Sequence, residues 1–257
     1  MKIVAIIEAR MTSSRLPGKV LKEIIGKPAI ELLIERLRSV KEIHEIMVAT
    51  TVNTTDDVIE ALCRRLYVVC FRGSENDVLG RVLQAAQSIE ANIIVEITGD
   101  CPLADPDIIR RGINMYLKGN YDYVGNGCFV RTFPDGMDVQ IFSVKLLEGV
   151  NILAQETVDR EHVTHYIYTH PECYKIGHYE ADGELHWPEL AITLDTPEDL
   201  VLISKIFEEL YPRNSLFTAY DIVRFLRQRP DLLGINTDQQ RLKNFLTNTP
   251  RSLGAKK

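Results

Sequence analysis

The chain has 257 residues, 45% of them apolar and 26% charged, which is ordinary for a soluble globular enzyme with one large α/β domain. The formal charge of −6 disfavours a general nucleic-acid binder, because such proteins are usually basic. The cysteines form no C-x-x-C pair, so the sequence indicates neither a disulfide framework nor a thiolate zinc site. No apolar run is long enough to span a membrane, and we expect a cytoplasmic protein.

Strands and helices alternate along the first half of the chain. Short apolar runs rich in β-branched residues predict buried strands at residues 3–7, 46–50, 68–71 and 93–97. Apolar residues at helical spacing predict helices that start at Pro28, after a cap at residues 53–55, at Val78 and at Pro106. This alternation is typical of βαβ units, so we expect a Rossmann-like, mostly parallel sheet with helices on both faces.

The pattern is less regular after Tyr121. Further strands are predicted at residues 121–124, 139–142, 174–179 and 191–194, with a loop at 131–136. Thr196 and Pro197 form a strong helix start, and one more helix is predicted at 222–227. We therefore expect one domain over residues 1–212, followed by a helical C-terminal tail over 213–257.

A cluster of positive charge follows the first predicted strand. Arg10, Arg15 and Lys19 lie within ten residues of one another, with Ser13 among the hydroxyl residues between them. Ligands of open parallel sheets bind outside the carboxyl ends of the strands, so this loop is expected to bind a polyphosphate. The alternative is a solvated basic loop. The loop is neither a Walker A sequence nor a G-x-G-x-x-G fingerprint, which argues against a P-loop kinase and a Rossmann dehydrogenase.

Two aspartates follow later predicted strands. Asp100 comes after the fourth strand, and Gly99 permits a sharp turn or a close approach to a ligand there. Asp195 lies between an apolar run and the helix cap Thr196. Each has a structural alternative, since Asp100 also suits a turn and Asp195 also suits a helix N-terminus. Mg²⁺ binds one or two protein carboxylates together with phosphate and water, so this pair is a candidate magnesium site.

Several segments of the chain match motifs of a known family, in the same order. They are residues 9–19 (ARMTSSRLPGK), 26–28 (GKP), 71–81 (FRGSENDVLGR), 98–103 (TGDCPL), 131–139 (RTFPDGMDV), 160–164 (REHVT) and 194–200 (LDTPEDL). The chain thereby resembles the cytidylyltransferases, which activate sugar acids such as ketodeoxyoctonate and neuraminate as CMP conjugates. The branch most resembled is the one named for spore-coat polysaccharide biosynthesis. The resemblance implies a fold like that of the nucleotide-diphospho-sugar transferases.

The resemblance also implies roles for residues on the nucleotide side. The implied catalytic residues are Arg15, Lys19 and Asp100, and the implied ligands of Mg²⁺ are Asp100 and Asp195. The implied nucleotide contacts are Arg10, Ser13, Arg15, Lys19, Arg72, Ser74, Arg81 and Asp100. In the sugar-acid enzymes the residue before the Gly-Asp pair is often Gln, whereas this chain has Thr98.

On the acceptor side, the resemblance implies contacts from Asp135, Asp138, Arg160 and His162. Two of these have structural alternatives. The Asp135-Gly136 pair also fits a simple turn, and two histidines three residues apart, such as His162 and His165, more often serve packing than metal binding. The family architecture implies that residues 131–186 form an arm in a homodimer, with no nucleic-acid or membrane partner.

The predicted reaction is attack by an acceptor oxygen on the α-phosphorus of CTP, with pyrophosphate as the leaving group. The predicted acceptor is a small acid, such as a sugar acid used in surface polysaccharide synthesis. Three alternatives stay open at this point. They are a nucleotidyltransferase with a phosphonate or sugar-phosphate acceptor, a glycosyltransferase that uses a nucleotide sugar, and a non-catalytic nucleotide-binding protein. The chain lacks the Asp-x-Asp motif that a glycosyltransferase would typically place after a central strand.

Overall fold

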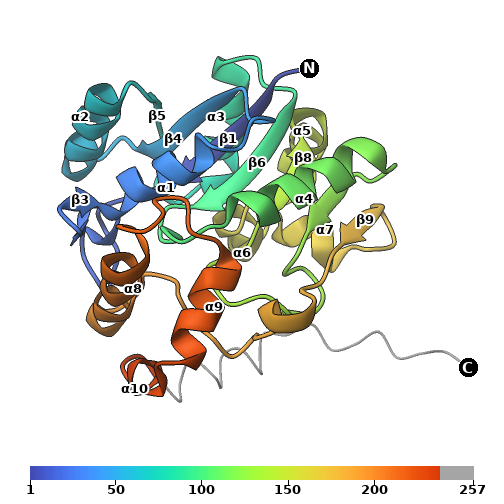
Figure 1. Ribbon diagram of the computed structural model, residues 1–257. Helices are drawn as coiled ribbons and strands as arrows, with labels where there is room; N and C mark the ends of the chain where they lie inside the picture. The colour runs from blue at the N-terminus through green and yellow to red at the C-terminus, as the bar shows by residue number, and fades with distance from the viewer. Residues whose placement is uncertain (238–257) are drawn as a thin grey trace, which may run out of the picture.

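A seven-stranded sheet forms the centre of the protein (Figure 1), and the computed structural model describes residues 1–237. The strand order is β5-β4-β1-β6-β8-β7-β9. The first four of these run parallel to one another, whereas β8 is antiparallel to both of its neighbours. The strands are Ile3–Glu8 (β1), Glu45–Thr51 (β4), Val69–Gly73 (β5), Ile93–Thr98 (β6), Tyr123–Gly125 (β7), Gln140–Ser143 (β8) and Ile176–His178 (β9). The prediction of a Rossmann-like, mostly parallel sheet is confirmed.

Helices cover both faces of this sheet because its central strands are apolar on both sides. In β1, Ala5 and Ile7 point into one core while Val4 and Ile6 point into the other, and all four are fully buried. The first core also contains residues of α1 (Ala29–Leu37), α2 (Asp57–Leu66), α4 (Pro106–Lys118), α8 (Pro197–Leu210) and α9 (Ala219–Arg227). The second contains residues of α3 (Val78–Ser88), α5 (Val144–Leu153) and α7 (His165–Thr169), and the short α6 (Thr157–Glu161) lies against α3.

The helix starts agree with the predicted capping chemistry only in part. Thr196 caps α8 in a reciprocal capping box with Asp199, and Pro197 is the first helical residue, as predicted. The predicted cap of α2 was wrong. A short 3₁₀ turn, Thr54–Asp56, precedes this helix, and Asp56 stands at the cap position without capping it. The reason is that the Asp56 carboxylate is held by other donors, described below.

The strand predicted at residues 191–194 was also wrong. This segment forms a single isolated bridge, between Ala191 and Asp135 in the loop before β8, and then continues without strand pairing. Its backbone hydrogen bonds go to two different loops. Ile192 donates to the carbonyl of Asp135, and Leu194 donates to the carbonyl of Asp100, both at 2.8 Å. The segment therefore ties the loop after β6 to the loop before β8, and this delivers Asp195 to the edge of the sheet.

The described part of the predicted C-terminal tail packs on the first core. Ile222, Val223 and Leu226 of α9 are fully buried there, and α10 (Pro230–Leu233) follows. The buried guanidinium of Arg36 fixes this region, because it donates to the carbonyls of Ala104 and Phe217 at 2.8 Å each. Burial lowers the pKa of Arg36 to about 10. The division at residue 212 stays a prediction, and its part at 238–257 lies outside the described residues.

A small two-stranded sheet, β2 (Glu23–Ile24) with β3 (Lys27–Pro28), follows the basic loop. On the far side of the molecule, a short 3₁₀ helix, Gly183–Leu185, lies beside α9. No helix within residues 1–237 has the length and apolar character that crossing a membrane would require.

Candidate active site

One lysine joins the two predicted metal carboxylates at the carboxyl ends of the strands. The Nζ atom of Lys19 lies 2.5 Å from Oδ2 of Asp100 and 2.8 Å from Oδ1 of Asp195. The three side chains are only 13–19% exposed. Burial disfavours the ammonium charge, but the two carboxylates raise the pKa of Lys19 above its ordinary value, so the lysine is charged. Asp100 and Asp195, which the sequence paired as a candidate metal site, therefore lie close together at this edge of the sheet.

The local backbone explains why these three side chains meet. Gly18 has a φ of 68° and its N–H donates to the carbonyl of Met11 at 2.9 Å, which closes the basic loop just before Lys19. The N–H of Gly99 donates to the carbonyl of Glu8 at 2.8 Å, and a β-carbon at position 99 would lie only 2.6 Å from that oxygen. Glycine at both positions therefore lets the loops after β1 and β6 approach closely enough to share a site.

The other cations of the basic loop reach outward from this centre. The Nη2 atom of Arg15 lies 3.0 Å from Oδ2 of Asp195, and its side chain is 59% exposed. Arg10 is 44% exposed, and its Nη1 atom lies 3.5 Å from Oε1 of Glu75. Ser13 is half-buried in the same loop. Two accessible guanidinium groups beside a partly buried lysine suit a ligand that carries several phosphates.

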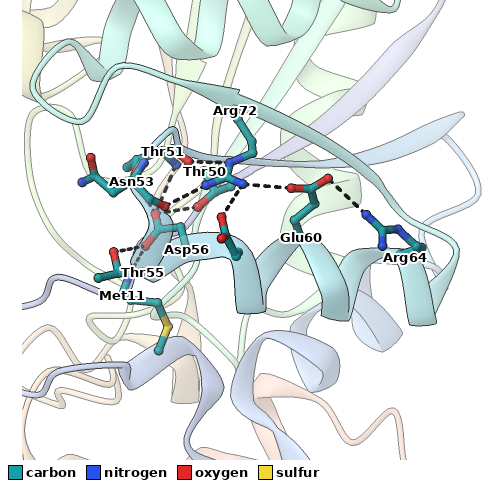
Figure 2. Close-up of polar contacts among 10 residues, drawn as sticks. Met11, Thr50, Thr51, Asn53, Thr55, Asp56, Glu60, Arg64 and Arg72 are labelled. Carbon is teal, nitrogen blue, oxygen red and sulfur yellow. Dashed lines mark hydrogen bonds and ion pairs between the residues drawn. The ribbon is translucent and has the colours of Figure 1, made fainter.

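A buried aspartate that the sequence analysis did not single out holds the start of this loop in place (Figure 2). Asp56 is fully buried, and its Oδ1 atom accepts from the N–H of Met11 at 3.0 Å. Its Oδ2 atom accepts from the hydroxyls of Thr50 and Thr51, at 2.8 and 2.7 Å, and from the Thr51 N–H at 3.2 Å. Burial opposes the charge of this carboxylate, but these donors hold the pKa of Asp56 below its ordinary value. The carboxylate thus links β4 to the basic loop.

Three more of the implied nucleotide contacts, Arg72, Ser74 and Arg81, are engaged in contacts around the same loops. Arg72 lies over the first turn of α2, with Nη1 at 2.6 Å from Asp57 and 2.9 Å from Glu60 (Figure 2 shows the second contact). The Ser74 hydroxyl accepts from the N–H of Asp77 at 3.1 Å, and its carbonyl accepts from the buried guanidinium of Arg81. Ser74 and Arg81 therefore shape the loop that carries Glu75, the partner of Arg10.

The residues implied in acceptor binding fall into two groups. Asp135 and Asp138 share Arg131, whose Nη1 atom lies 3.3 Å from the first and 2.7 Å from the second carboxylate. Through the hydrogen bond from Ile192 to the carbonyl of Asp135, this group adjoins the segment that carries Asp195. Arg160 instead pairs with Asp77, at 2.5 Å, at the start of α3. His162 is exposed.

A second carboxyl pair, also not singled out from the sequence, lies buried behind the basic loop. Glu8, at the end of β1, and Glu96, in β6, lie close enough together for each carboxyl to affect the pKa of the other. Burial is the main cause that raises the pKa of both, and Arg81 and His162 lie close enough to Glu8 to oppose the rise there. Two carboxyls this close, in a site that disfavours charge, cannot both be ionised without a large cost, so the pair favours sharing one proton.

We expect Glu96→Gln to stabilise the protein at alkaline pH. The folded-state pKa of Glu96 is raised above its ordinary 4.5, so the native protein loses stability as the pH rises above that value, and the glutamine amide removes this loss. Urea unfolding should give a gain of about 1 kcal/mol or more at pH 8 that largely disappears at pH 4.5. Parallel stability–pH curves for the two proteins would contradict the shared proton.

Two solved structures superpose on most of this chain. A cytidylyltransferase from Leptospira borgpetersenii superposes with a TM-score of 0.85 at 31% identity, covering 91% of this chain and 97% of that one. A CMP:2-keto-3-deoxy-manno-octonic acid synthetase, solved in complex with CTP, superposes with a TM-score of 0.61 at 19% identity, covering 81% and 99%. The second similarity shows the fold alone.

Several proteins are similar to this chain in sequence. An uncharacterised protein of Methanocaldococcus jannaschii is 36% identical over 240 residues, 93% of this chain and 96% of its own. The spore coat polysaccharide biosynthesis protein SpsF of Bacillus subtilis is 31% identical over 89% of this chain and 95% of its own. A 3-deoxy-manno-octulosonate cytidylyltransferase of Geobacter metallireducens is 37% identical over 44% of each chain. The cytidylyltransferase family model matches residues 4–228, and the chain belongs to this family of nucleotidyltransferases.

Proposed function

We propose that this cytidylyltransferase transfers CMP from CTP to a small acidic acceptor and releases pyrophosphate. The observation that carries the proposal is the cluster of Lys19, Asp100 and Asp195 beside the exposed Arg10 and Arg15. This arrangement offers positive charge for a triphosphate next to hard oxygen ligands for a divalent ion.

The two carboxylates fit Mg²⁺, because both already converge on one cation in the structure. Residues 1–237 contain no cluster of three or more ligating side chains, which also suits Mg²⁺, since this ion takes its remaining ligands from phosphate and water. Asp100 and Asp195 would hold the ion. When bound, it would supply charge neutralisation at the α-phosphate.

The chain's own side chains would do the remaining work. In our proposal Arg15 and Lys19 stabilise the charge that builds up on the leaving pyrophosphate, and Arg10 and Ser13 orient the phosphates. Ser74 and Arg81 shape the pocket for base and ribose, with Arg72 behind them. The acceptor oxygen attacks the α-phosphorus as the bond to the β-phosphate oxygen breaks, so catalysis comes from positioning and charge.

For the acceptor we propose a sugar acid used in surface polysaccharide synthesis. The names of two relatives support this, one for spore coat polysaccharide and one for an octulosonate. Asp135 and Asp138 lie beside the segment that carries Asp195, where they would bind acceptor hydroxyls, while Arg160 and His162 would approach the acid group.

The test is a screen for pyrophosphate release with each nucleoside triphosphate, Mg²⁺ and a panel of sugar acids, phosphonates and sugar phosphates. We expect release to require both CTP and a sugar acid, with the acceptor recovered as its CMP conjugate. If pyrophosphate is released with a phosphonate or a sugar phosphate but not with any sugar acid, the proposed class of acceptor is wrong. Glycosyl transfer from a nucleotide sugar, with no pyrophosphate, would overturn the proposed reaction.

We also propose that the protein is a homodimer in the cytoplasm, with residues 131–186 as the arm that joins the subunits. This segment leaves the regular alternation of strands and helices, and it contributes exposed apolar side chains at Ile152, Leu153 and Val158. Light scattering at micromolar concentration should give twice the mass of 29.2 kDa calculated for one chain. A mass of one chain under these conditions would contradict the dimer.

A further inference from the structure

The ammonium group of Lys19 lies where a divalent ion would have to touch both carboxylates. Its Nζ atom is within 2.8 Å of one oxygen from Asp100 and one from Asp195. Mg²⁺ binds carboxylate oxygens at about 2.0–2.1 Å, so an ion that bridges the same two oxygens would occupy nearly the same point as this nitrogen. The ammonium group and the ion cannot both be there.

Electrostatic repulsion, in addition to steric overlap, opposes binding of a divalent ion while Lys19 is in place. The lysine and both carboxylates are only 13–19% exposed, so water screens their charges weakly. Arg15 adds a second positive group, 3.0 Å from the other oxygen of Asp195. The carboxylates are therefore already neutralised in the free protein, and an arriving divalent ion meets repulsion from two cations.

The lysine side chain can leave without disturbing the loop that carries it. The backbone of this residue is fixed by hydrogen bonds from its own N–H to the Leu16 carbonyl and from the Lys22 N–H to its carbonyl, both at 3.1 Å. Only the flexible four-carbon stem has to move. The exposed guanidinium of Arg15, on the same loop, indicates where an anionic ligand would approach.

We propose that Lys19 and the divalent ion exchange places when the nucleotide binds. In the free protein Lys19 holds Asp100 and Asp195 together. With metal and triphosphate present, Asp100 and Asp195 would hold the ion, and the Lys19 side chain would turn to the phosphates. This step rests on the proposed function, since it requires a metal at these aspartates. Its consequence is that the free protein binds metal weakly, and that metal and nucleotide each strengthen the binding of the other.

The test is a titration of the nucleotide-free protein with Mn²⁺. The electron paramagnetic resonance signal of unbound Mn²⁺ monitors the binding. We expect Lys19→Met and Lys19→Gln to bind Mn²⁺ about tenfold more tightly than the native protein, because the competing cation is gone. Lys22→Met is the matched control: it removes the same charge from an exposed position three residues away, and its Mn²⁺ affinity should match that of the native protein. Circular dichroism confirms that each variant is folded.

A double variant tests whether the added Mn²⁺ affinity comes from a site at Asp195. If Asp195→Asn is combined with Lys19→Met, the gain in Mn²⁺ affinity should disappear. Unchanged Mn²⁺ affinity in both Lys19 variants, or a gain that survives in the double variant, would overturn the exchange. The Lys19 variants could instead show the expected gain in Mn²⁺ affinity while the native protein turns over no CTP with any acceptor. That result would overturn the proposed function but not the exchange.

Discussion

Asp195→Ala is expected to lower kcat by about 100-fold or more, and Asp100→Ala should do the same. Both carboxylates contact one partly buried cation, the ammonium group of Lys19, at 2.5 and 2.8 Å. In the proposed mechanism they hold the metal that neutralises the α-phosphate, whose charge is largest in the transition state. Loss of either should therefore reduce turnover much more than it weakens CTP binding. Steady-state kinetics and a separate titration of CTP binding measure the two effects.

Asp231→Ala provides the control for this experiment. Its carboxylate is 61% exposed and pairs with Arg229 at 2.7 Å at the start of α10, outside residues 131–186, so the variant should retain the native kcat. The native protein should also lose activity in excess chelator and regain it with Mg²⁺. Full activity of either site variant, or of the native protein in chelator, would be incompatible with a metal at Asp100 and Asp195.

The sequence predicts the parallel part of the sheet well because each central strand is a short apolar run buried on both faces. The loops after β1 and β6 were predicted to carry function for a different reason: ligands of open parallel sheets bind outside the carboxyl ends of the strands. The roles of the predicted site residues stay predictions, but Lys19, Asp100 and Asp195 do meet. Their meeting depends on the segment at 190–195, whose path was predicted wrongly.

The features that the sequence did not predict depend on contacts between distant segments. α5 follows β8 without a loop, and Ser143 both ends the strand and caps the helix, so the apolar pattern shows no break there. Glu8 and Glu96 lie 88 positions apart in sequence and meet only because β1 and β6 pair. Asp56 looks like a helix cap from its neighbours, and only the approach of Met11 reveals its role. No local pattern contains such information.

Asp56→Ala is expected to damage both stability and nucleotide binding. The variant leaves two threonine hydroxyls and the N–H groups of Thr51 and Met11 buried without their acceptor. Unsatisfied buried donors cost about 1–3 kcal/mol each before relaxation, so we expect a loss of about 3 kcal/mol in the free energy of unfolding. Because Met11 begins the basic loop, the KM for CTP should also rise. Urea unfolding and steady-state kinetics measure the two effects, with Asp231→Ala as the exposed control.

The pH dependence of the free energy of unfolding tests whether Asp56 stabilises the protein through its charge or only through packing. Its folded-state pKa lies below the ordinary 3.8, so its contribution to stability is fully present above that value and is lost as the pH falls through the folded-state pKa. The native protein should therefore lose stability on acidification below about pH 4 more steeply than Asp56→Ala, and the two curves should converge. Asp56→Asn keeps the shape of the side chain, but its NH₂ group would face the hydroxyl and N–H donors that the carboxylate accepts from. We therefore expect its stability at pH 7 to resemble that of the alanine variant. An asparagine variant as stable as the native protein at pH 7 would mean that the carboxylate charge does not hold this loop.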